Sequence, residues 1–88
     1  MTIDSKVSVR DTVFLQEVDD EIVLLDINTE EYYSLDEIGG IFYKFLKEEE
    51  DLPVIVRELA EHFNVKSQEI EKDLFTFIKS LKEKGLVE

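Results

Sequence analysis

Hydrophobic spacing changes once along this chain, close to residue 35, and that change limits the folds open to it. Before that point, short runs rich in branched and aromatic residues are separated by two turn-forming pairs, Asp19-Asp20 and Asn28-Thr29. After it, apolar residues recur every three or four positions, which is typical of helices that bury one face. Strands that precede helices, rather than alternating with them, indicate an α+β fold.

Three antiparallel strands are expected in the first part of the chain. Thr12 to Val18 alternates loosely, and Glu21 to Ile27 is apolar on both faces, as a central strand is. Glu31 to Leu35 follows the second turn, in which Asn28 is the residue best able to adopt a positive φ. The third strand is therefore predicted to lie at an edge of the sheet.

Two helices are expected next. Ser34 together with Glu37, or Asp36 on its own, can cap the first, and an acidic run from residue 48 to residue 51 ends it. Asp51 can cap the second helix, which breaks at Asn64. Their apolar positions at helical spacing are Ile38, Ile41, Phe42, Phe45 and Leu46 in the first, and Val54, Leu59 and Phe63 in the second.

The third helix has the clearest signals, with Ser67 as its N-cap and Gly85 as its stop. Asp73 and Thr76 lie on one flank of its apolar stripe, and Phe75 lies on the other. The stripe is Ile70, Leu74, Phe77, Ile78 and Leu81. A sheet followed by three helices, with a short break before the last, predicts a winged helix-turn-helix-like α+β fold.

Length and composition limit the protein to a small domain. Its 88 residues are expected to form one domain, residues 1–88, and the absence of cysteine excludes disulfides and thiolate chemistry. The longest apolar run, Ile22 to Leu25, is far shorter than the ~20 residues that span a bilayer, and the N-terminal residues lack the apolar stretch of a signal peptide. A soluble cytoplasmic protein is the expectation.

Charge argues against nucleic acid as a partner. The chain carries a net charge of -12, and residues 17–51 hold 13 acidic residues against two lysines. The third helix has as many acidic as basic residues and no arginine to read guanine. Acidic side chains keep a small domain soluble, and their field would also favour a neutral or weakly basic peptide.

No catalytic or metal-binding pattern stands out. His62 is the only histidine and has no nucleophile near it in sequence, so an ordinary surface role is the simpler interpretation. The acidic run at residues 48–51 lacks the alternating spacing of a calcium loop. Gly39 and Gly40 lack the pattern of a phosphate loop, so they predict close packing of the first helix on the sheet.

The expected third strand has few features that would prevent pairing with another chain. Its central residues, Tyr32, Tyr33 and Ser34, include no proline or charge, and one of the two tyrosines must point away from the core. An edge of this kind beside a helix is a setting in which an extended peptide can add as a further strand.

Three segments, Asp26 to Gly39, Glu71 to Phe77 and Glu83 to Glu88, resemble the PqqD-like family in their order along the chain. These domains capture the leader of a ribosomally made precursor peptide and deliver it to tailoring enzymes. The resemblance implies that a leader adds antiparallel to the third strand, with apolar anchors in a groove against the third helix. The site residues it implies are Glu31, Tyr32, Tyr33, Ser34, Leu35, Asp73, Phe75, Thr76 and Phe77, with Phe77 also contributing to the core.

Two positions depart from the family pattern. Glu30 stands where a glycine is common, which would move the strain of the turn to Asn28, and Phe42 and Tyr43 stand near a position often held by tryptophan. The length resembles the discrete recognition proteins of lasso-peptide pathways, which implies a separate leader peptidase and a macrolactam cyclase as partners, with no cofactor, metal or catalytic residue. The alternative from another class is a regulatory winged-helix domain that binds DNA or another protein.

Overall fold

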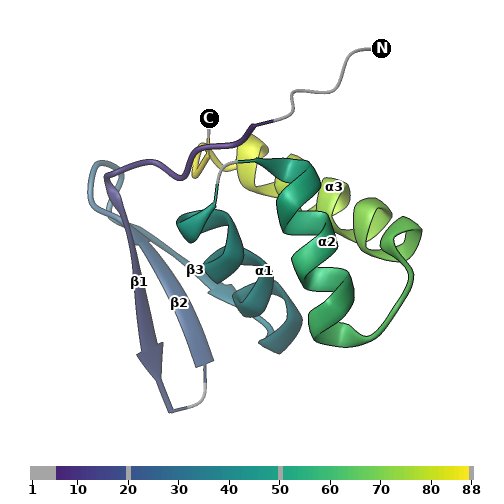
Figure 1. Cartoon of the computed structure of the whole chain (residues 1–88). Helices are drawn as coiled ribbons and strands as arrows, with labels where there is room; N and C mark the ends of the chain where they lie inside the picture. Colours follow the sequence, from purple (N-terminus) through teal and green to yellow (C-terminus); the bar gives the residue numbers. More distant parts are fainter. Residues whose placement is uncertain (1–5, 20, 50, 88) are drawn as a thin grey trace.

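The structure is a computed structural model that describes residues 6–19, 21–49 and 51–87. It has three strands followed by three helices, as the sequence predicts (Figure 1). The strands are β1 (Val13–Val18), β2 (Glu21–Asp26) and β3 (Glu31–Leu35), and the helices are α1 (Glu37–Glu48), α2 (Leu52–Phe63) and α3 (Ser67–Glu83). The first two strands are thus one residue shorter than expected, without Thr12 and Ile27.

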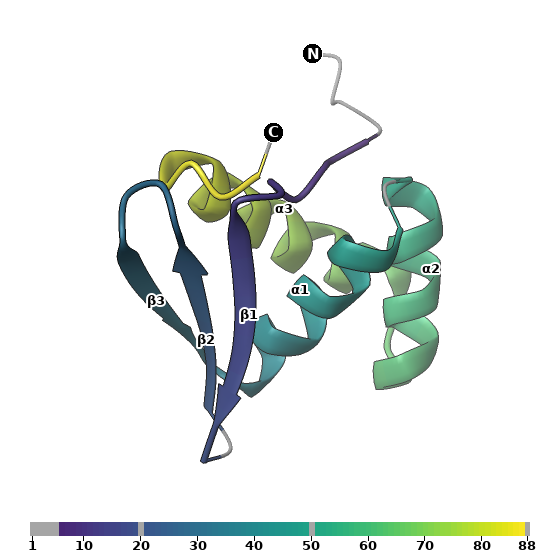
Figure 2. The same ribbon diagram turned by 90° about the vertical axis from the view of Figure 1, so that its left-hand side faces the viewer.

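The sheet is antiparallel in the order β1-β2-β3, so β2 is the central strand. Leu24 of β2 is fully buried and lies opposite Leu15 of β1 and Tyr33 of β3, which both pack against the core. Because side chains alternate along a strand, this row marks the inner face of the sheet. The three helices all lie on that side, and α1 lies between the sheet and α2 in both views (Figures 1 and 2).

The turn between β2 and β3 differs from the expectation. Its residue of positive φ is Glu30, at 62°, and not Asn28. Asn28 instead donates its backbone N–H to the Asp26 carboxylate at 3.0 Å, which fixes the first half of the turn. The left-handed conformation therefore falls at the position where a glycine is common in the family, but this chain has a residue with a Cβ there.

Helix α1 is capped by Asp36, one of the two predicted alternatives. The Asp36 carboxylate accepts the Gly39 N–H at 2.6 Å, whereas Ser34 remains within β3. Gly40 faces the sheet so closely that an added Cβ would lie 2.2 Å from Cδ1 of Ile22. The prediction that the glycine pair brings α1 close to the sheet is confirmed for Gly40, whereas the tight neighbours of Gly39 are Asp36 and Phe77 of α3.

The other helix ends are partly as expected. Asn64 ends α2 in the left-handed conformation with φ at 55°, and Gly85 follows α3 with φ at 72°. The prediction of Ser67 as N-cap of α3 is wrong, because Lys66 occupies that position and Ser67 is the first helical residue. Asp51 is the N-cap of α2, although its side chain makes no capping hydrogen bond.

The core lies between the inner face of the sheet and the helices. On α3, Ile70, Leu74, Ile78 and Leu81 are buried as predicted, and Phe77 is half-buried. On α1 the predicted stripe is partly wrong, since Ile38 is 48% exposed whereas Tyr43 is fully buried. The ends of the described chain lie side by side, joined by an antiparallel bridge between Val9 and Val87 (Figures 1 and 2).

Candidate functional site

The outer edge of β3 has no strand beside it among the described residues. Ile27 donates its N–H to the Thr12 carbonyl at 3.0 Å, which sets the alternation of hydrogen bonds along β2. Odd-numbered residues of β2 therefore bond to β1 and even-numbered residues bond to β3. It follows that Tyr32 and Ser34, opposite odd-numbered residues, direct their backbone N–H and C=O groups to the open edge.

The two tyrosines of β3 point to opposite faces, as predicted. Tyr32 is 66% exposed on the face away from the helices, whereas Tyr33 is half-buried on the inner face. The Tyr33 hydroxyl donates to Glu31, and this hydrogen bond, followed by burial, raises the pKa of the Tyr33 hydroxyl above its ordinary value. Glu31 thus fixes the position of the Tyr33 hydroxyl, and Tyr32 is the more exposed of the two tyrosines.

A groove of about 410 Å³ lies beside the end of β3, between the first turns of α1 and the middle of α3. Its walls come from β3 and α1, which are consecutive in the chain, and from α3, which is distant from them in sequence. The lining residues are Ser34 and Leu35 from the end of β3, Asp36, Ile38, Gly39 and Phe42 from the start of α1 and its N-cap, and Asp73, Thr76, Phe77 and Ser80 from α3. The groove therefore adjoins the open edge at Ser34.

Aromatic packing forms the floor of this groove. The Phe77 ring meets the Phe42 ring edge-on, with 5.7 Å between centroids, and Phe42 is buried beneath it. Gly39 lets the two helices approach, because an added Cβ would lie 3.2 Å from a ring carbon of Phe77. Ile38 stands at the wall with half its surface exposed, so it offers an apolar contact to a ligand.

Polar groups lie along the α3 side of the groove. Thr76 donates its hydroxyl to the Lys72 carbonyl at 3.1 Å, which turns the hydroxyl toward its own helix and leaves its methyl group available. Asp73, one turn before Phe77, is exposed and is the charged group on this wall. The groove is thus apolar at its base and has two carboxylates in its lining, Asp73 on the α3 side and Asp36 at the start of α1.

Five of the nine site residues predicted from the sequence line this groove: Ser34, Leu35, Asp73, Thr76 and Phe77. Glu31, Tyr32 and Tyr33 lie further along β3 and belong to the edge rather than to the groove. Phe75 does not line it, because that ring lies on the other flank of α3 and packs against the core. The groove occupies the Asp73 and Thr76 flank.

Sequence reasoning missed the residues that α1 contributes. Ile38, Gly39 and Phe42 all line the groove, yet the helical spacing of Ile38 and Phe42 predicts only core. A signal was available in Gly39, because a glycine in the first turn of a helix often marks the close approach of another chain segment. The exposure of Ile38, however, depends on the rotation of α1, which the sequence does not show.

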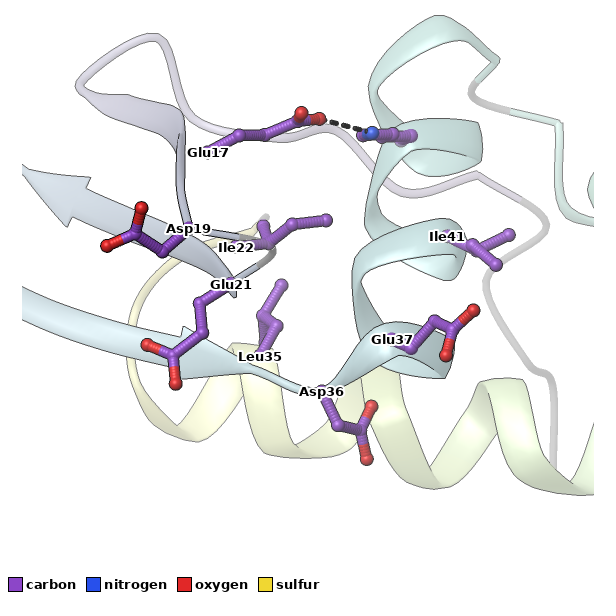
Figure 3. Close-up of a pocket in the computed structure, with 9 residues that line it drawn as sticks. Glu17, Asp19, Glu21, Ile22, Leu35, Asp36, Glu37 and Ile41 are labelled. Atoms are coloured by element: carbon purple, nitrogen blue, oxygen red, sulfur yellow. Dashed lines mark hydrogen bonds and ion pairs between the residues drawn. The ribbon is translucent and has the colours of Figure 1, made fainter.

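A second hollow, of about 750 Å³, lies between the tip of the β1–β2 hairpin and α1, and it shares Leu35 and Asp36 with the groove (Figure 3). Ile22 and Leu35 project into the space between the strands and α1, whereas the carboxylates of Asp19, Glu21 and Asp36 point outward (Figure 3). The hollow also holds an ion pair between Lys44 and Glu17. The diverging carboxylates make this end of the sheet strongly negative.

Two further features bear on the class of protein. Within the described ranges, no three His, Cys, Asp or Glu side chains are grouped so that they could hold a metal ion. None of the helices in the described part of the chain is both long and apolar enough to cross a membrane.

Two solved structures share the fold of this chain. A protein solved as "TbiB1 in Complex with the TbiA(beta) Leader Peptide" is 32% identical, covers 92% of this chain and 94% of its own, and superposes with a TM-score of 0.82. "Lasso peptide synthetase B1 complexed with the leader peptide" is 23% identical, covers 94% and 98%, and has a TM-score of 0.80, which shows the same fold. No curated protein sequence matches the chain.

The family assignment comes from the sequence model described as coenzyme PQQ synthesis protein D, which matches residues 21–87. This span includes β2, β3 and all three helices, and therefore the whole of the groove. The resemblance noted in the sequence is confirmed by the family model and by the fold of the two solved structures. The chain belongs to the PqqD family.

Proposed function

We propose that this protein binds the leader segment of a ribosomally synthesised precursor peptide and presents it to a separate leader peptidase, in the manner of a lasso-peptide pathway. A macrolactam cyclase would then act on the freed core peptide. The observation that carries the proposal is the juxtaposition of an open strand edge, at Tyr32 and Ser34, with the groove floored by Phe77. The leader-bound relative at 32% identity supports it.

Two kinds of contact divide the work of recognition. The peptide pairs with β3 as a fourth strand, and its backbone exchanges hydrogen bonds with the N–H and C=O groups of Tyr32 and Ser34. These bonds are independent of the peptide's side chains. Apolar side chains on one face of the added strand then enter the groove between Leu35, Ile38 and Phe77, which selects among sequences.

An antiparallel leader places its N-terminal residues near Leu35 and its C-terminal residues near Glu31, because β3 runs from Glu31 to Leu35. The N-terminal portion then passes Asp36, the acidic residue that directly follows β3. The part of the precursor to be cleaved leaves from the Glu31 end. Binding therefore requires no chemical step by this chain, since it holds one end of the peptide and exposes the other.

The test is a titration with candidate leader peptides, using variants matched at each position. Tyr32→Pro and Ser34→Pro each remove one N–H from the open edge, whereas Tyr32→Val and Ser34→Ala change the side chain and keep the N–H. We expect each proline variant to bind at least ten-fold more weakly than its partner, with circular dichroism unchanged. Equal affinities within each pair would exclude strand addition.

Amide chemical shifts locate the contact independently. On adding leader, we expect shifts at Tyr32 to Leu35 and at Asp73 to Phe77. Shifts confined to β1 or α2, with β3 unmoved, would contradict the proposed mode of binding even if the peptide binds tightly.

A further inference from the structure

The face of the sheet that points away from the helices carries most of the exposed apolar side chains. Phe14, Val18, Ile27 and Tyr32 are each about half exposed or more. Phe14, Val18 and Tyr32 lie on this outer face by the alternation of the strands, and Ile27 directly follows β2. The other large apolar side chains with comparable exposure in the described residues are Ile38 in the groove and Val65 after α2. The outer face is therefore a distinct apolar surface.

The apolar side chains form a continuous row across the sheet. Phe14 of β1 lies opposite Leu25 of β2, which lies opposite Tyr32 of β3. Neighbouring side chains in such a row are about 5 Å apart, so the three make contact across all three strands. Both views show the outer face with no helix over it (Figures 1 and 2).

The charge around this face indicates what can cover it. From residue 11 to residue 43 the sequence contains ten acidic residues and no lysine, arginine or histidine. Glu21 lies opposite Val18 on the outer face itself. A membrane with anionic headgroups would be repelled, as would a nucleic acid. The complementary surface has an apolar centre with lysine or arginine at its rim.

A second copy of this chain does not fit. It would bring a further net charge of -12 against the same acidic rim. Three strands about 4.8 Å apart and about 18 Å long cover roughly 250 Å². An obligate dimer buries about 1,000 Å² or more on each partner. The size and charge of the face suit a transient contact with a different protein.

We propose that the outer face of the sheet docks the enzyme that processes the bound leader, through an apolar and basic surface of that enzyme. This inference rests on the function proposed above. Tyr32 joins the two sites, since its backbone faces the open edge while its side chain faces outward. An enzyme seated on Phe14, Leu25 and Tyr32 lies directly beside a peptide added to β3.

The test uses the double variant Phe14→Thr/Val18→Thr, which keeps strand propensity but removes apolar surface from β1, away from the leader edge. Val65→Thr is the matched control, because Val65 is also exposed but lies between α2 and α3. Two quantities are measured on each protein: the Kd for fluorescent leader, and the concentration of the protein that half-maximally stimulates leader cleavage by the peptidase encoded with the precursor.

We expect the double variant to bind leader within two-fold of the native Kd but to need at least ten-fold more protein for half-maximal stimulation. Val65→Thr should match the native protein in both. If the double variant binds leader normally and stimulates cleavage as the native protein does, the outer face is not the docking surface. A native protein that binds no leader would instead overturn the proposed function.

The reversal Glu21→Lys provides a second, independent variant, because it changes charge on an exposed residue without removing apolar contacts. If the double variant does not fold, Glu21→Lys alone tests whether the outer face docks the enzyme. We expect Glu21→Lys to raise the half-stimulating concentration several-fold at low salt with leader affinity retained. An unchanged concentration would contradict docking through a basic rim.

Discussion

The ring of Phe77 on α3 packs edge-on against the ring of Phe42 on α1, with 5.7 Å between their centroids. Phe42 is buried and Phe77 is half-buried, so one aromatic pair is at once part of the core and the floor of the groove. In the mode of binding proposed above, binding and stability are coupled at Phe77. They are separable at Ile38, which is exposed in the groove, and at Phe75, which lies outside it.

This separation predicts three different outcomes from single truncations in the groove region. Ile38→Ser should weaken leader binding by about 1 to 2 kcal/mol with little change in the free energy of unfolding, because half of that side chain is exposed. Phe77→Ala should weaken leader binding and lower the free energy of unfolding, each by about 2 kcal/mol. Phe75→Ala should lower stability alone, since it lies outside the groove. Urea unfolding and anisotropy titration measure the two quantities, and a loss of affinity in Phe75→Ala would place the site on the other flank of α3.

The turn before β3 predicts a gain in stability from glycine at one position. Glu30 has a φ of 62°, a conformation that costs a residue with a Cβ roughly 1 to 2 kcal/mol. Glycine removes this cost, but its greater loss of backbone entropy on folding cancels part of the benefit. Glu30→Gly should therefore raise the free energy of unfolding by up to about 1 kcal/mol. Asn28→Gly should lower it, since Asn28 is not among the residues of positive φ. Chemical denaturation of both variants measures these changes. A more stable Asn28→Gly and a less stable Glu30→Gly would show that the residue of positive φ is Asn28.

Tyr43 predicts a second stabilising change and a dependence on alkaline pH. Its hydroxyl is buried without a hydrogen-bond partner in the described residues, so Tyr43→Phe should add about 1 kcal/mol of stability. Burial also raises the pKa of the Tyr43 hydroxyl from 10.0 to about 12. The unfolded chain loses this proton first, so between pH 10 and 12 stability should fall by up to about 1.4 kcal/mol per pH unit.

The measurement is the stability of the native protein as a function of pH, and the matched control is the same measurement on Tyr43→Phe. Tyr33, whose pKa is also raised, remains in both proteins, so the difference between their alkaline slopes belongs to Tyr43. Equal slopes would show that the Tyr43 hydroxyl is not buried as the structure places it.

DNA should not be a partner. Helix α3 balances its lysines with acidic residues, and the sheet beside it has none of the roughly 6 to 10 cationic contacts that make binding strong and salt-sensitive. A gel shift with duplex DNA at low salt should show no retardation. Saturable retardation at sub-micromolar protein would favour the regulatory winged-helix alternative.

Peptide processing should require a separate enzyme. His62 is exposed and packs edge-on against Phe45 and Phe63, with ring centroids 5.7 Å and 4.9 Å apart, so its ring contacts are with aromatic side chains. The purified protein should leave its precursor intact over hours, as followed by mass spectrometry. Cleavage that His62→Ala abolishes would overturn a purely binding role.

Local signals in the sequence predicted local structure well where a single residue type dominates. Asp36 caps α1, Asn64 and Gly85 end α2 and α3 in left-handed conformations, and Gly40 admits Ile22. Errors arose where neighbours compete. Glu30, rather than Asn28, takes the positive φ because Asn28 donates its N–H to Asp26, and Tyr43, rather than Ile38, is buried because of how α1 is rotated against the sheet.

The sequence by itself determined the order of the strands and helices, the position of β3 at the edge and the apolar stripe of α3, since each follows from spacing along a short stretch of chain. Only the tertiary structure decided which flank of α3 faces the groove, which residues of α1 join it, and that Tyr32 and Ser34 hold the outward N–H groups. These depend on the rotation of helices against the sheet and on the register of the strands, which contacts between distant residues set together.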